Sequence, residues 1–281
     1  MKDARGTSSQ LQTISLTCSP KSHSIPHMEE VVPLFKSHYS LGRSILTLEM
    51  PEEERNEESS DSIFDIAQEG GMKEVFLVED TMAGFLEAYT NANELGIKLI
   101  FGIRMTFCPD LFEKSEEGRK SSYKNIIFIK DEEGYKHLIK IYTFAAQEGF
   151  YYEPRLDFKT LKEMWSDKLI LGMPFYDSFL YNNKYTDSQC IPDFSFTDPI
   201  FFTESNDTLL DIDMKKRVEE FCKDKYEVVR AKSIYYKNKK DFPAYLTFRC
   251  INKRTSLEKP NFDGMCSNEF CYESYKEVLN G

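Results

Sequence analysis

Short apolar runs alternate with segments of helical periodicity along this chain, most clearly over residues 73–104. Residues 74–78 and 97–103 are rich in β-branched and aromatic side chains, a composition typical of buried parallel strands. Between them, apolar residues recur at helical spacing after Thr81, a suitable N-cap, and Gly96 suits the left-handed position that closes a helix. The pattern therefore predicts one β-α-β unit.

The same alternation continues on both sides of this unit. Strands alternating with amphipathic helices predict a parallel α/β barrel or sheet. Further strands are expected at 31–35, 125–130, 169–171, 200–203 and 227–231, and helices at 131–147, 158–165, 209–222 and 241–251. The residues expected in the core are Val75, Phe76, Leu77, Ile100, Ile127 and Phe128.

Candidate chemistry lies where two of these predicted strands end. Glu79 and Asp80 follow the strand at 74–78, and Arg104 follows the strand at 97–103. Parallel α/β folds hold their sites at the carboxyl ends of the strands, so these side chains are expected to lie close together.

Composition limits the classes of function. The 281 residues carry a formal net charge of −11, which argues against a general basic surface for nucleic acid but leaves a local basic groove open. Residues 1–30 are polar and weakly patterned, and are expected to form a flexible arm before a domain at 31–281. The acidic run at 51–61 is expected to be a solvated loop.

Cysteine usage and hydropathy indicate a cytoplasmic protein. The chain has seven cysteines, an odd number without a CxxC pair, as expected for reduced thiols rather than disulfides or a zinc knuckle. No apolar run approaches the roughly 18 residues of a membrane span. The amino terminus also lacks the apolar region of a signal peptide.

Several motifs together resemble one known family. The best segment is 125–157, NIIFIKDEEGYKHLIKIYTFAAQEGFYYEPRLD, and the unit at 73–104, SHYSL at 37–41, the segment 228–251 and SNEF at 267–270 follow the same order. These segments resemble the polymerase-and-histidinol-phosphatase (PHP) domain at the amino terminus of the bacterial DNA polymerase III alpha subunit. The chain looks like a divergent stand-alone or phage-like version, in which the resemblance covers residues 31–280.

This resemblance implies a distorted (β/α)7 TIM-like barrel of the PHP type. Active members hold a trinuclear metal cluster at the strand ends and hydrolyse phosphoesters or excise nucleotides. Imidazole and carboxylate ligands suit the Zn²⁺ or Mn²⁺ ions of such a cluster, which activate water and hold phosphate oxygens.

The sequence departs from the family at nearly every ligand position, so the metal-binding motifs are degenerate. The first histidine motif falls on Leu34 and Lys36, or with a gap on Lys36 and His38. The positions expected to line the vestigial pocket are Lys36, His38, Glu79, Asp80, Arg104, Ser233 and Tyr235.

Two of these positions are cationic where divalent ions would bind. Lys36 and Arg104 would repel a metal cluster, and Glu79 and Asp80 are expected to pair with them in a salt-bridge network. His38 is interpreted as a structural residue, because a lone imidazole is a poor metal site. We therefore expect no catalytic residue, no metal and no cofactor.

Three functional hypotheses follow. The first is a catalytically inactive structural and protein-binding module of DNA replication, whose partner is the polymerase core or a proofreading exonuclease. It would not polymerise by itself or bind nucleic acid strongly. The second is a metal-dependent phosphoesterase or 3′–5′ exonuclease that holds Zn²⁺ or Mn²⁺ with His38, Glu79, Asp80 and Asp177. The third is a viral mimic that competes for replication partners.

Overall fold

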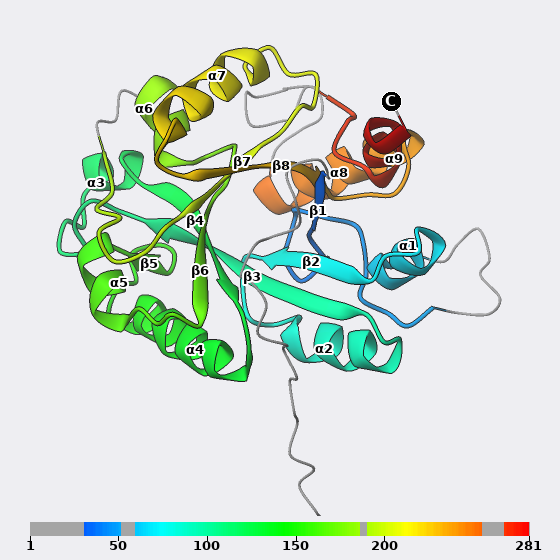
Figure 1. Cartoon of the computed structure of the whole chain (residues 1–281), viewed down its shortest axis with the longest axis horizontal. Helices are drawn as coiled ribbons and strands as arrows, with labels where there is room; N and C mark the ends of the chain where they lie inside the picture. Colours follow the sequence, from blue (N-terminus) through cyan, green and yellow to red (C-terminus); the bar gives the residue numbers. More distant parts are fainter. Residues whose placement is uncertain (1–30, 52–59, 186–189, 255–266, 281) are drawn as a thin grey trace, which may run out of the picture.

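A computed structural model describes residues 31–51, 60–185, 190–254 and 267–280 of the chain (Figure 1). The predicted arm at 1–30 and most of the acidic run at 51–61 lie outside the described residues, so the division at residue 30 stays a prediction. Eight strands form one sheet: β1 Val32–Phe35, β2 Glu74–Glu79, β3 Lys98–Phe107, β4 Tyr123–Ile129, β5 Arg155–Leu156, β6 Leu169–Met173, β7 Ile200–Thr203 and β8 Glu227–Ile234.

The sheet closes into a barrel of seven strands. The ring runs β1-β2-β3-β4-β6-β7-β8 and closes because β1 pairs with β8 as well as with β2. The short strand β5 pairs with the last two residues of β3, on the edge of β3 opposite β4. The predicted distorted TIM-like barrel of seven strands is therefore confirmed.

One strand corrects the expectation of a parallel barrel. β4 runs antiparallel to both of its neighbours, β3 and β6, whereas the other pairings in the ring are parallel. The connection from β3 to β4 holds only the five-residue helix α3, Glu116–Lys120, and brings the chain back at the same end of the barrel. Because β4 begins at the end of the barrel where β3 stops, it runs antiparallel to β3. A parallel strand would need a connection that crosses to the opposite end of the barrel.

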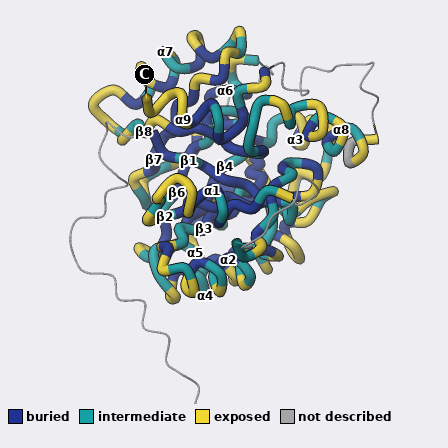
Figure 2. Tube along the Cα trace, turned by 90° about the vertical axis from the view of Figure 1, so that its right-hand side faces the viewer, coloured by how far each residue is buried: buried dark blue, intermediate teal, exposed yellow. Residues whose placement is uncertain are grey.

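The longer helices lie around the outside of the barrel (Figure 1). Buried stretches gather in the strands, and exposed stretches lie on the surrounding helices and loops (Figure 2). The helices are α1 Ile63–Glu69, α2 Phe85–Glu94, α4 Glu132–Gln147, α5 Phe158–Met164, α6 Phe179–Tyr185, α7 Asp211–Cys222, α8 Phe242–Lys253 and α9 Tyr272–Asn280.

Local signals explain several helix ends. Asp131 caps α4 by accepting a hydrogen bond from the amide of Gly134, and Gly96 has the predicted left-handed backbone, with φ of 68°. The N-cap prediction at Thr81 is wrong, because α2 begins at Phe85 after Gly84. Thr81 instead closes a local turn by accepting a hydrogen bond from the amide of Ala83.

The strands bury apolar side chains on both faces, toward the barrel interior and toward the helices. Five of the six predicted core residues are buried, but Ile100 is only partly buried. It packs against the edge of the interior cluster, near the amino-terminal end of β3. Further along β3, Gly102 leaves space for Phe128, since a Cβ there would lie 2.6 Å from the Phe128 ring.

Two expectations from composition concern cysteines and membrane spans. The cysteines within the described residues are free thiols: Cys108, Cys190, Cys222, Cys250 and Cys271. Among the described helices, none combines the length and the apolar composition that crossing a membrane requires.

Candidate functional site

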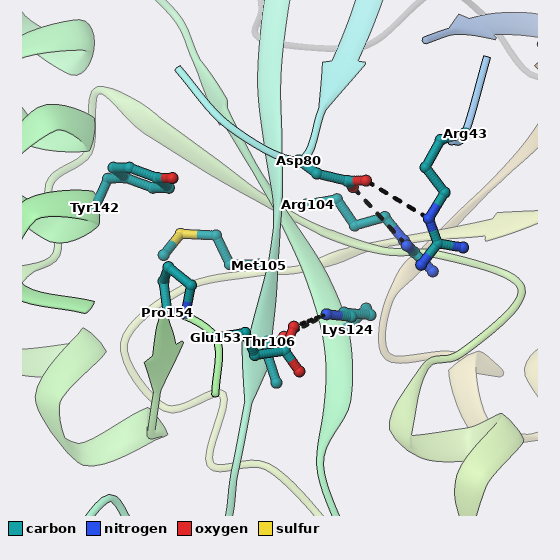
Figure 3. A pocket seen from close by; sticks show the side chains of 9 residues that line it. All are labelled: Arg43, Asp80, Arg104, Met105, Thr106, Lys124, Tyr142, Glu153 and Pro154. Carbon is teal, nitrogen blue, oxygen red and sulfur yellow. Dashed lines mark hydrogen bonds and ion pairs between the residues drawn. The ribbon is translucent and has the colours of Figure 1, made fainter. Parts of the chain in front are cut away.

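The carboxyl ends of the strands place a cluster of charged side chains at one mouth of the barrel (Figure 3). Lys36 follows β1, Asp80 follows β2 and Arg104 lies in β3. Each occupies one of the alternate positions whose side chains point into the barrel interior. Lys124 joins them from the beginning of β4, because this strand runs in the opposite direction. A parallel β4 would put Lys124 at the far end, so the sequence-based prediction missed it.

Asp80 is the centre of this cluster. Its Oδ1 accepts a hydrogen bond from Lys36 Nζ at 2.8 Å and lies 4.0 Å from Arg104 Nη1, while Oδ2 lies 3.7 Å from Arg43 Nε. Burial opposes ionisation, but the charges of Lys36, Arg104 and Arg43 outweigh it and hold the pKa of Asp80 well below its usual range. The predicted salt bridges of Asp80 with Lys36 and Arg104 are present, and Arg43 is an addition.

Arg104 has a second carboxylate partner, Asp177, with which it forms a close ion pair. Asp177 lies in the turn after β6 with a left-handed backbone, φ of 61°, which aspartate tolerates better than most residues. Burial opposes the charge of Arg104, but Asp177 and Asp80 together raise its pKa, so the guanidinium stays charged.

Glu79 corrects the expected network. It is fully buried, and it accepts hydrogen bonds from the Ser37 amide at 2.8 Å and from the Ser40 hydroxyl, not from Lys36 or Arg104. Adjacent strand residues point to opposite faces, so Asp80 enters the mouth while Glu79 continues the outward-facing positions of β2. The Ser40 oxygen also accepts a hydrogen bond from the Asp80 amide at 2.8 Å, which ties the ends of β1 and β2 together.

His38 does not line the charged cavity, contrary to the sequence-based expectation. It lies in the turn after β1, where its amide donates to the Leu46 carbonyl at 2.8 Å. Its ring packs on Tyr39, with 4.4 Å between the ring centroids.

Ser233 and Tyr235 lie beside the cluster, around a smaller cavity that also reaches Lys36 and Arg104. Ser233 donates to Glu204 through its amide at 2.9 Å and through its hydroxyl at 2.8 Å. Burial raises the pKa of Glu204, although these hydrogen bonds oppose the shift. Glu204 was not predicted as a site residue, yet the signal existed, because a carboxylate directly follows the predicted strand at 200–203.

The charged cluster surrounds a cavity of about 120 Å³. Lys124 closes one side of it, with its Nζ 2.8 Å from Glu153 and a hydrogen bond to the Thr106 hydroxyl. Tyr142 of α4 turns its hydroxyl toward the cavity from the opposite side (Figure 3). The lining residues are Arg43, Asp80, Arg104, Met105, Thr106, Lys124, Tyr142, Glu153 and Pro154.

These residues do not fit the metal cluster that the resemblance implies. The described part of the chain contains no group of three or more His, Cys, Asp or Glu side chains arranged to hold a metal ion. The alternative ligands are not brought together either, since His38 and Glu79 lie outside the cavity wall. Asp80 and Asp177 do approach a common point, but the group between them is the Arg104 guanidinium.

Comparisons with known proteins agree with this architecture. Residues 57–180 match the PHP domain family. DNA polymerase III subunit alpha from Borreliella burgdorferi is 26% identical over 69% of this chain, and the subunit from Aquifex aeolicus is 27% identical over 74%. The subunit from Chlamydia trachomatis is 42% identical over 26% of this chain and 6% of its own length.

The barrel and the family match together define the class: the chain folds as a seven-stranded α/β barrel, and residues 57–180 of it are similar to the PHP domain family. More particularly, it is related to DNA polymerase III subunit alpha, as the resemblance predicted. The chain spans about a fifth of the length of the first two relatives, 18% and 20%.

Proposed function

We propose that this chain is a catalytically inactive PHP domain of the DNA polymerase III alpha type, which serves DNA replication as a structural and protein-binding module. One observation carries the proposal. The carboxylate at the barrel mouth, Asp80, already has a cationic partner, Lys36, 2.8 Å away, and two arginines close by. These cationic side chains lie at the strand ends, where the resemblance implies the metal cluster of active family members.

The energetics support this proposal. At an effective dielectric constant of 20, two unit charges of like sign 4 Å apart repel by about 4 kcal/mol, and a divalent ion doubles that figure. A metal ion at Asp80 would meet this repulsion from Arg104 and would also displace Lys36. Arg104 cannot relieve the repulsion by losing its proton, because its paired carboxylates raise its pKa.

The partner is inferred from the relatives and from charge. The relatives are named as subunits of a DNA polymerase, which supports a replication context. With a net charge of −11, the chain suits contact with protein better than a general grip on nucleic acid. We propose the polymerase core or a proofreading exonuclease as the partner.

The test of inactivity is a metal titration beside an activity assay. We expect calorimetry with Zn²⁺ and Mn²⁺ to show no tight stoichiometric site, and a generic phosphodiester to remain intact with and without chelator. Asp80→Asn is the informative variant, and Asp167→Asn, at an exposed carboxylate, is its matched control. Chelator-sensitive hydrolysis that disappears only in Asp80→Asn would contradict the proposal and favour the phosphoesterase hypothesis.

Binding is tested separately with purified partners. We expect the chain to co-elute in size-exclusion chromatography with either a recombinant polymerase core or a proofreading exonuclease. An unrelated acidic protein of similar size is the control for nonspecific association. The absence of a complex with both partners would contradict the binding role while leaving the result on hydrolysis unaffected.

A further inference from the structure

The cavity is bordered by ion pairs that contain more cations than carboxylates. Its described ion pairs involve four cations and three carboxylates, although the whole chain has a net charge of −11. The cations are Lys36, Arg43, Arg104 and Lys124, and the carboxylates are Asp80, Glu153 and Asp177. A surplus of positive charge in a confined site attracts an anion.

Arg43 is the cation that the carboxylates hold most loosely. Its Nε lies 3.7 Å from Asp80, beyond hydrogen-bond distance, and its side chain is 37% exposed. Lys36 binds the same carboxylate at 2.8 Å. A guanidinium has five donors in a rigid fork, so a contact of 3.7 Å through Nε leaves other donors of Arg43 that can turn toward the cavity.

The other walls supply donors from different directions. The guanidinium groups of Arg43 and Arg104 lie next to each other on one side of the cavity, and Lys124 lies below them (Figure 3). The hydroxyl of Tyr142 points inward from α4 on the far side (Figure 3). Donors that converge from several sides suit a tetrahedral anion, because each of its oxygens can meet a different donor.

The size of the cavity limits what can enter. A cavity needs roughly 10–15 Å³ to hold one water, so a cavity of about 120 Å³ has room for several waters. That space accommodates one small oxyanion. Met105 and Pro154 close part of the wall with apolar groups, which lowers the local dielectric and strengthens charge interactions.

We infer that this cavity binds a tetrahedral oxyanion of the phosphate class, either free phosphate or the terminal group of a phosphomonoester. Arg43, Arg104 and Lys124 supply the charge without a metal ion. The inference rests on the proposed function in one respect, namely that side-chain cations and not metal ions make the mouth positive. Arg43 moves toward the anion, while Arg104 keeps Asp177 as its carboxylate partner.

The experiment is calorimetric titration of the full chain with inorganic phosphate in EDTA, at constant ionic strength, with chloride as the reference salt. We expect saturable binding of one phosphate. Arg43→Gln and Lys124→Gln should each weaken it about tenfold or more, the factor that one charge-assisted hydrogen bond contributes. Arg230→Gln, at an exposed arginine outside this cavity, is the matched control and should bind as the wild type does.

Further titrations identify the source of the anion and separate the two proposals. Phenyl phosphate binding more tightly than phosphate supports a phosphomonoester, and equal binding supports the free anion. The inference is overturned if phosphate gives no saturable signal, if acetate binds equally well, or if Arg43→Gln retains wild-type affinity with an unchanged circular dichroism spectrum. Absence of binding with and without metal overturns this inference alone, whereas binding that requires Zn²⁺ or Mn²⁺ also overturns the metal-free function.

Discussion

Replacement of Glu79 by alanine tests how the barrel mouth is held together. Glu79 is fully buried and accepts hydrogen bonds from the Ser37 amide and the Ser40 hydroxyl. Each hydrogen bond to a charged group contributes about 1.5–3 kcal/mol, so Glu79→Ala should lower the free energy of unfolding by about 3–6 kcal/mol. Part of this loss arises because the buried Ser37 amide keeps no acceptor for its hydrogen.

The measurement is urea denaturation of the wild type and the variant at pH 7. We expect a lower midpoint with an unchanged slope, since the surface exposed on unfolding stays similar. Glu79→Gln retains one acceptor oxygen and should lose less stability than Glu79→Ala. Glu163→Ala, at an exposed position on α5, is the matched control and should stay within about 0.5 kcal/mol of wild type. Equal midpoints for Glu79→Ala and Glu163→Ala would refute the reasoning.

Two further predictions concern the interior and the charge of the mouth. Gly102→Ala should destabilise the barrel by about 1–3 kcal/mol, because its Cβ would lie 2.6 Å from the Phe128 ring. The loss of stability is measured by thermal unfolding. The matched change is Gly71→Ala, at a glycine with positive φ and open space around it, where a Cβ would cause backbone strain but no steric clash. The pKa of Asp80 is depressed in the folded state. Its contribution to the free energy of unfolding is therefore complete above the pKa of about 3.9 that it has in the unfolded chain, and it is lost as the pH falls toward the folded pKa. Between pH 7 and pH 2, the free energy of unfolding should therefore fall less in Asp80→Asn than in the wild type. If the free energies of the two proteins fell in parallel with pH, Asp80 would make no pH-dependent contribution to stability.

Local sequence signals determined much of the scaffold. The β-α-β unit at 73–104 follows from two apolar runs around a helical repeat, and Gly96 closes its helix as predicted. These features depend on near neighbours in the chain, which periodicity and backbone preference describe well. The barrel type came from the resemblance, since alternating strands and helices by themselves also allow an open sheet.

Several features of the site depended on the tertiary structure. Strand alternation places Glu79 and Asp80 on opposite faces, but β2 is apolar on both faces, so the pattern did not say which carboxylate enters the mouth. The direction of β4 brought Lys124 into the cavity, and the turn after β1 brought Arg43 to Asp80. Arg104 and Asp177 pair across 73 positions of sequence. Such contacts are set by how the barrel closes, because closure brings the ends of distant strands to one mouth, and no local pattern encodes that juxtaposition.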